Sequence, residues 1–317
     1  MTSKTGSAFN LDELLSRRMV MVSGKGGVGK TTVAVALALL AARRGRRVLL
    51  AQFESNVDAG QLLGRTPVGT EASEVEPGLS LVNMTPRSAL REYGMLIFRF
   101  RAIYRAVMEN RTVRHFLRAI PGLDEYAMLG KAWYHTTQLE RGRSRFDLVV
   151  VDAPATGQAI KVLGVPRAIL KNVPESMLTR DARTIQSFLT DPRRCCAVLV
   201  TLAEELPVTE VLELEGALRE RVGIDVAGLV VNCLYPPVRC AELLERVSPT
   251  PGTDERLATL LEEAHIFQQR RAINERHLRQ LRERSAAPLQ ELPLLFIDSV
   301  SRPQIELLVA ALEGMTA

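Results

Sequence analysis

Ten consecutive residues near the amino terminus have the composition of a phosphate-binding loop. Residues 23–32 read Ser-Gly-Lys-Gly-Gly-Val-Gly-Lys-Thr-Thr, which fits the pattern G-x-x-x-x-G-K-[ST]. Glycines let the main chain approach a phosphate closely, and successive N–H groups then form an anion site at the positive end of a helix. The residues predicted to bind a nucleotide are Gly24, Gly26, Gly27, Val28, Gly29, Lys30, Thr31 and Thr32.

Individual side chains of this loop have separate predicted roles. Lys30 is expected to reach the β- and γ-phosphates, and the hydroxyl of Thr31 is expected to bind Mg²⁺. Lys25 is an additional lysine directly after the first glycine. The alternative is a glycine-rich turn that matches by chance. It is disfavoured because an apolar run (19–22) leads in and an Ala/Val/Leu-rich helical segment (33–42) leads out.

A second polar cluster follows a buried strand in the middle of the chain. Residues 146–151 are almost continuously apolar, which is typical of a strand buried on both faces. They lead into Asp-Ala-Pro-Ala-Thr-Gly-Gln at 152–158. Asp152 is expected to orient Mg²⁺ or its water ligands, and Gly157 lets the backbone move towards a γ-phosphate. A loop that orders on the γ-phosphate is a switch; the alternative is a Pro/Gly turn after a core strand.

Two more strands deliver polar residues to the same edge. The apolar strand 48–53 runs into Glu54, and the strand 226–233 ends near Asn232. In open parallel sheets the carboxyl ends of the strands form the ligand edge. A carboxamide there can read adenine through its donor and acceptor.

The remaining pattern alternates strands with helices. We predict further strands at 79–84, 195–202 and 293–297, a loop at 64–78, and helices at 11–17, 208–221, 253–284 and 303–312. This alternation favours a doubly wound α/β fold with a mainly parallel sheet, in one P-loop domain over 1–317.

Residues 88–141 have a helical period and are too long for a simple crossover, with a last helix over 123–139. We predict an inserted helical subdomain, to which 159–194, broken by Pro166 and Pro174, can add. Its first helix is unusually apolar. Ordinary core packing is one explanation, and an adaptable apolar surface for a partner is the other. The residues that widen this stripe are Met95, Phe98, Tyr104 and Met108.

Composition limits the class of protein. The chain has 317 residues, of which 46% are hydrophobic, so it is globular, and its formal net charge is +5. The arginines are spread along the chain, whereas nucleic-acid binding favours a concentrated patch. Four cysteines indicate a reducing cytoplasm without a disulfide framework. No window approaches ~20 consecutive apolar residues, so we expect membrane contact only at the periphery or through a partner.

These motifs resemble one family. The loop 24–31 resembles the deviant phosphate loop of the SIMIBI class of P-loop ATPases. Residues 152–158, with Val165-Pro166, look most like the second switch of the arsenical-pump and tail-anchored-protein-targeting branch. The usual form there is Asp-Thr-Ala-Pro-Thr-Gly-His followed by Leu-Pro. Residues 201–207 and Val231-Asn232 resemble later segments of that branch.

The resemblance implies an ATP-hydrolysing switch with ATP and Mg²⁺ between two subunits, identical or related. Lys25 then reaches the partner's phosphates, or it makes only a local phosphate contact. Asp152 assists Mg²⁺, and Asn232 and the backbone near Pro293 contact adenine. The helical subdomain presents or hides an apolar surface for a hydrophobic client or a membrane-protein partner.

Three departures from the branch matter. Glu54 stands where the branch has the aspartate that positions the attacking water. A longer carboxylate does this less well, so we expect slow or partner-dependent hydrolysis. Gln158 replaces the usual histidine. The Cys-x-x-Cys of a zinc tether is absent, and the four cysteines (Cys195, Cys196, Cys233 and Cys240) read as buried or incidental thiols rather than a metal site.

Two other functions stay open as alternatives. A metalloid (arsenite) efflux motor needs clustered thiolates, and a chain of that kind commonly has two fused halves, whereas this one has a single phosphate loop. A partition- or division-type positioning ATPase needs a membrane-targeting final helix or a basic DNA patch. Residues 304–312 contain no basic residue.

Overall fold

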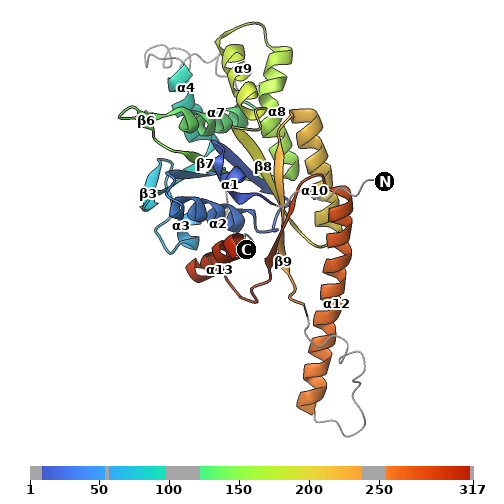
Figure 1. The fold of residues 1–317 in the computed structure, drawn as a ribbon. Coiled ribbons are helices and arrows are strands. Elements are labelled where there is room, and N and C mark those ends of the chain that lie inside the picture. The colour runs from blue at the N-terminus through green and yellow to red at the C-terminus, as the bar shows by residue number, and fades with distance from the viewer. Residues whose placement is uncertain (1–8, 54–56, 98–121, 238–254, 315–317) are drawn as a thin grey trace.

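A mainly parallel sheet forms the centre of the molecule. The computed structural model describes residues 9–53, 57–97, 122–237 and 255–314. Its largest sheet has the strand order β10-β9-β8-β1-β7-β2-β4-β3 (Figure 1). All neighbours in that sheet are parallel except β3 and β4. This confirms the predicted α/β fold.

The parallel strands are β1 (Met19–Gly24), β2 (Val48–Phe53), β4 (Leu79–Met84), β7 (Leu148–Ala155), β8 (Cys195–Leu202), β9 (Val226–Leu234) and β10 (Leu289–Pro293). The antiparallel β3 (Ser73–Glu76) lies at the sheet edge, inside the stretch predicted as loop. Its sequence is polar and charged, as is typical of edge strands that must not pair further. A separate small hairpin pairs β5 (Leu139–Glu140) with β6 (Arg143–Ser144).

The described helices cover both faces of this sheet. They are α1 (Leu11–Ser16), α2 (Lys30–Arg43), α3 (Ala59–Leu62), α4 (Pro86–Ile97), α7 (Leu123–Thr137), α8 (Thr156–Asn172), α9 (Met177–Leu189), α10 (Glu205–Ala217), α12 (Glu255–Arg284) and α13 (Arg302–Glu313), and a short π-helix (Leu218–Val222) continues α10. Figure 1 shows α12 projecting beyond the sheet.

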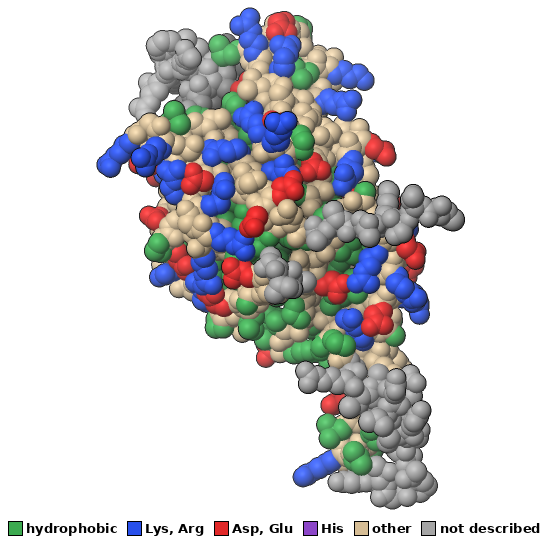
Figure 2. All heavy atoms as spheres, in the orientation of Figure 1, with side chains coloured by type: hydrophobic (Ala, Val, Ile, Leu, Met, Phe, Trp, Pro, Cys, Tyr) green, Lys and Arg blue, Asp and Glu red, His purple; other side chains and the backbone are tan. Residues whose placement is uncertain are grey.

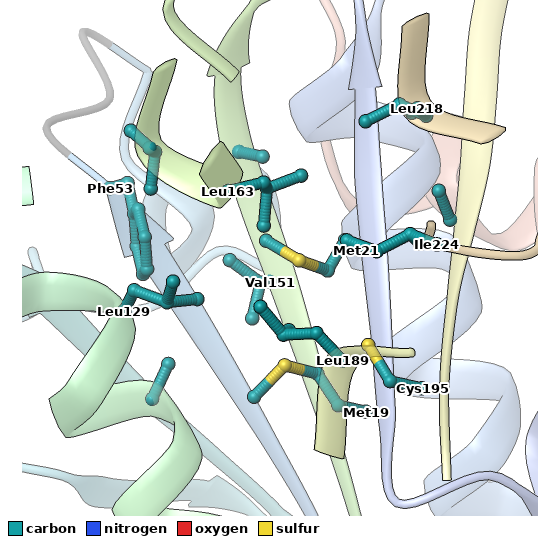
Figure 3. Close-up of a cluster of buried hydrophobic side chains, with 14 of the residues drawn as sticks. Met19, Met21, Phe53, Leu129, Val151, Leu163, Leu189, Cys195, Leu218 and Ile224 are labelled. Carbon is teal, nitrogen blue, oxygen red and sulfur yellow. The ribbon is translucent and has the colours of Figure 1, made fainter. Parts of the chain in front are cut away.

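The core has two clusters because successive strand residues point to opposite faces. Met19 and Met21 of β1 belong to the cluster that also contains residues of α7, α8, α9 and α10 (Figure 3). Val20 and Val22 belong to the other cluster, with residues of α1, α2 and α13. Burial on both faces explains why these strands read as continuous apolar runs.

Several predicted boundaries are wrong. Asp152 lies on β7, which extends to Ala155, so α8 starts at Thr156 without an intervening loop. Pro166 lies inside α8 instead of breaking it. Burial of the apolar face of α8 outweighs the ~3 kcal/mol that an internal proline costs.

The last strand was predicted over 293–297 but is β10, which ends at Pro293. β10 is an edge strand, so only alternate residues, Gln290 and Leu292, are buried. The prediction of 293–297 was based on a continuous apolar run, which an edge strand does not need. Proline has no N–H to continue the ladder, and the regular strand stops there.

The inserted helical subdomain remains a prediction. Residues 98–121, including Phe98, Tyr104 and Met108, lie outside the described residues. At its two ends, α4 packs against α7, and α7 packs against α8. None of the described helices combines the length and apolar character that a membrane span needs. On the face that Figure 2 shows, Lys and Arg side chains are spread over several elements and interspersed with Asp and Glu.

Candidate nucleotide site

The phosphate loop connects β1 to α2 at the carboxyl edge of the sheet. Its backbone requires glycine at two points. Gly24 has φ +155°, and a Cβ placed there would lie 2.1 Å from the carbonyl oxygen of Val200 on the neighbouring β8. Gly29 has φ +92° and is the residue before the first turn of α2. The glycine spacing therefore reflects close approach to the sheet as well as to a ligand.

A cavity of about 500 Å³ opens over this loop. It is bounded by the loop, the start of α2, the ends of β2 and β7, Val57 after β2, Met128 of α7 and Gln158 of α8. The lining residues are Gly26, Gly27, Gly29, Lys30, Thr31, Thr32, Phe53, Val57, Met128, Asp152, Ala153, Pro154, Ala155 and Gln158. The loop and the second predicted cluster thus meet at one cavity.

Lys30 is held at the inner side of the loop. Its Nζ donates to the backbone carbonyl of Lys25 at 2.9 Å. Burial lowers the pKa of Lys30 below its usual value, and the nearby charge of Asp152 opposes that shift. A partly desolvated ammonium of this kind gains from an anion in the cavity, as a phosphate would provide.

Thr31 and Asp152 form the polar floor of the site. The Thr31 hydroxyl donates to Asp152 Oδ2 at 2.7 Å, and Asp152 is 3% exposed. Ser23 at the end of β1 donates to the carbonyl of Pro154 at 3.1 Å, which ties the loop to the end of β7. Two segments more than 120 residues apart in sequence, the phosphate loop and the end of β7, therefore converge at the edge where a metal site is predicted.

Asn232 forms a hydrogen bond with the backbone of the phosphate loop. Its side chain is 6% exposed and donates to the carbonyl of Val28 at 3.0 Å. A Cβ on Gly29 would lie 2.4 Å from the Asn232 amide nitrogen, so glycine at 29 is what allows this contact. The predicted adenine contacts of Asn232 and Pro293 remain predictions, since neither residue is among those that line the cavity.

Lys25 points to a different partner from Lys30. Its Nζ lies 2.6 Å from Glu210 Oε1 on α10, and both side chains are about one-third exposed (31% and 34%). Lys25 is absent from the described lining of the cavity. Glu210 had no local signal in the sequence, because it lies 185 residues from Lys25.

Gln52 is a site residue that the sequence reasoning missed. It is the one polar side chain in the otherwise apolar β2, and it is 1% exposed. Its amide contacts Asp152 and the chain at Val57 and Ala59. A polar residue one position before the end of a buried strand, at the ligand edge, was the available signal.

The predicted catalytic residue Glu54 and the four cysteines are the other residues that the sequence singled out. Glu54 lies outside the described residues, as does Cys240. Cys195 and Cys196 are buried on β8, where burial raises the pKa of Cys195 well above its usual value and that of Cys196 to about 12. Such thiols are poor thiolate ligands. No group of three or more His, Cys, Asp or Glu side chains in the described part could hold a metal ion.

A glycine-rich loop between the first strand and a helix, on a parallel sheet with an acidic strand end beside it, defines a P-loop nucleotide hydrolase. The family model for the anion-transporting ATPase matches residues 17–182, more than half of the chain. The chain belongs to this family and is an ATPase.

Curated relatives carry related names. ATPase BagA of Mycobacterium tuberculosis is 29% identical over 242 residues, covering 74% of this chain and 71% of that protein. An arsenical pump-driving ATPase of Escherichia coli is 28% identical over 239 residues, covering 69% of this chain but only 40% of that protein. ATPase GET3 of Kluyveromyces lactis is 26% identical over 165 residues, covering 49% of this chain and 47% of that protein.

Proposed function

We propose that this ATPase is a switch built from two subunits, in which Lys25 of each subunit acts on the nucleotide of the other. The observation that carries the proposal is the contrast between the two lysines. Lys30 Nζ is held within its own loop, whereas Lys25 Nζ is held 2.6 Å from Glu210, away from its own cavity. A cation supplied to a partner's phosphoryl group is worth ~10³–10⁵ in rate.

The chain's own residues fit Mg²⁺ as the companion of ATP. The Thr31 hydroxyl and the Asp152 carboxylate lie 2.7 Å apart on the cavity floor. One hydroxyl and one carboxylate are the usual protein share of a site that the phosphates complete. Bound Mg²⁺ would neutralise charge on the transferring phosphoryl group. In this proposal Thr31 and Asp152 hold it, Lys30 holds the β- and γ-phosphates, and the loop N–H groups orient them.

The direct test measures ATPase rate and oligomeric state together. Size-exclusion chromatography with light scattering is run without nucleotide, with ADP and with a slowly hydrolysed ATP analogue, alongside turnover at increasing protein concentration. A switch of the proposed kind dimerises with the analogue, and its turnover per chain rises with protein concentration. A chain that stays monomeric and turns over at a concentration-independent rate contradicts the proposal.

The client surface is the second part of the proposal. It rests on the apolar stripe of Met95, Phe98, Tyr104 and Met108 in the sequence, and we infer that nucleotide binding controls its exposure. The test is binding of a fluorescent hydrophobic probe with and without the ATP analogue, repeated with Phe98→Gln and Tyr104→Gln. Probe binding that depends on neither nucleotide nor these two residues overturns this part.

Among the alternatives, similarity to an arsenical pump-driving ATPase favours a metalloid-efflux motor. The buried thiols of Cys195 and Cys196 give that function little support. The apolar face of α13 packs in the core through Ile305, Leu308 and Leu312, so it is not available as the membrane-targeting helix of a positioning ATPase.

A further inference from the structure

We propose that Gln52 is a positioning residue that couples Asp152 to the chain segment 57–59, which follows β2 and contributes Val57 to the lining of the cavity. The inference rests on the proposed Mg²⁺ role of Asp152 but not on a second subunit. Gln52 does not line the cavity itself, so it acts through the groups that it holds.

Sheet register places the two side chains together. β2 and β7 are parallel neighbours, and Gln52 is directly opposite Asp152. Residues at matched positions of neighbouring strands point to the same face of the sheet. Gln52 Nε2 accordingly lies 3.4 Å from Asp152 Oδ2, the same oxygen that accepts from Thr31.

The same amide also holds the chain after β2. Nε2 donates to the carbonyl of Val57 at 2.8 Å, and Oε1 accepts from the N–H of Ala59 at 2.9 Å. These two bonds flank Asp58, whose side chain caps α3 by accepting from the N–H of Gln61. Val57 lines the cavity. One buried amide therefore joins the Asp152 carboxylate on the cavity floor to the backbone of the segment that carries Val57.

The chemistry of an amide suits this coupling. A buried carboxamide left without partners is costly, so its orientation follows the groups around it. When Asp152 changes its partners on metal binding, its bond to Gln52 changes, and so does the hold on Val57 and Ala59. Side chains that orient metal-binding groups in this way typically change metal affinity by 10–100-fold when removed.

The test variant is Gln52→Met, which keeps the length but removes the amide. We expect ATP affinity in EDTA to stay within about twofold of the wild type. The increase in affinity that Mg²⁺ brings should fall about tenfold. The N–H of Ala59 should exchange with deuterium faster, and that exchange should stop responding to Mg²⁺ and ATP. Gln290→Met is the matched control, since Gln290 is a buried glutamine on a distant strand of the same sheet.

A double variant separates coupling from a general structural role. If Gln52 acts through Asp152, adding Gln52→Met to Asp152→Asn causes no further loss of the Mg²⁺ effect. An unchanged Mg²⁺ effect in Gln52→Met, or fully additive losses in the double variant, overturns the inference. An Asp152→Asn protein with the wild-type Mg²⁺ effect instead contradicts the proposed role of Asp152. If Gln52→Met does not fold, Gln52→Asn keeps the amide one methylene short of its partners and serves in its place.

Discussion

The two lysines of the phosphate loop lie in different surroundings, although only four residues separate them in the sequence. We call Lys30, Thr31 and Asp152 the inner half of the site, and Lys25, Gly26, Gly27 and Glu210 the outer half. In the inner half the side chains are partly or wholly buried and bonded within the site. In the outer half, Lys25 and Glu210 form an ion pair with both side chains about one-third exposed.

The difference indicates which half one chain can complete. The inner half is organised by the sheet, because β1, β7 and α2 bring its groups together before any ligand binds. An exposed ion pair such as Lys25–Glu210 contributes only ~0.2–1 kcal/mol, so it opposes little when Lys25 moves to another anion. We therefore propose that the inner half binds the nucleotide and that the outer half controls turnover.

We expect the largest loss of ATP affinity and turnover when the Lys30 side chain is removed from the inner half. Lys30→Ala removes the cation that we propose binds the β- and γ-phosphates, so ATP affinity should fall by roughly 100-fold or more, and turnover should fall to background. Isothermal titration calorimetry measures the first and phosphate release the second. Unchanged affinity would show that the loop does not bind phosphate through Lys30. Equal thermal stability of the ligand-free proteins is the control for folding.

Removing the Lys25 side chain from the outer half should lower turnover without lowering ATP affinity. Lys25→Ala should keep ATP affinity and lower turnover by ~10³-fold, because the missing cation acts only on the transferring phosphoryl group. Single-turnover kinetics at saturating ATP measures this loss. Near-normal turnover would leave Lys25 as a local contact.

Mixing the two variants tests whether Lys25 acts on the nucleotide of its own subunit or on that of the other subunit. A Lys25→Ala subunit binds ATP, and a Lys30→Ala subunit still supplies Lys25, so a mixed dimer has one complete site. Turnover should recover above that of both variants alone. If Lys25 serves its own nucleotide, the mixture has no complete site and stays inactive.

Two glycines of the loop should differ in how much their substitution lowers the free energy of unfolding. Gly24→Ala places a methyl group against the backbone of β8, and we expect it to destabilise the protein by roughly 3 kcal/mol. Gly26→Ala meets nothing within 4 Å, so its free energy of unfolding should stay near that of the wild type. Urea denaturation without nucleotide measures both. Equal losses in the two variants would mean that Gly26, in the outer half, is as tightly packed as Gly24 is against β8.

The smallest expected effect is release of the outer ion pair. Glu210→Gln frees Lys25, so ATP-dependent dimerisation or turnover should rise by up to about fivefold, the equivalent of ~1 kcal/mol. The rise should shrink at high salt, because salt already weakens the pair in the wild type. Glu213→Gln, an exposed neighbour on α10, is the matched control. A fall in turnover would instead give Glu210 a positive role in the reaction.

Features whose residues are contiguous in the chain could be predicted from the sequence. The phosphate loop is ten consecutive residues, and its pattern identified the strand, the loop and the helix around it. The strands at 48–53, 79–84 and 195–202 were predicted to the residue. The first and third are buried and almost continuously apolar, whereas 79–84 includes the polar, half-buried Ser80 and Asn83. Asp152 was found because it follows another apolar run, although the expected loop proved to be the end of β7.

The hydrogen-bond and ion-pair partners of these residues became known only from the folded structure. Gln52 reaches Asp152 across 100 residues, and Lys25 reaches Glu210 across 185. Both contacts depend on strand order and register, which no local pattern encodes. The same holds for Pro166, which packing keeps inside α8, and for the edge strand β10, where only alternate residues need burial. The loop on its own identified a phosphate site, but the division into inner and outer halves arose when the sheet brought β2, β7 and α10 around it.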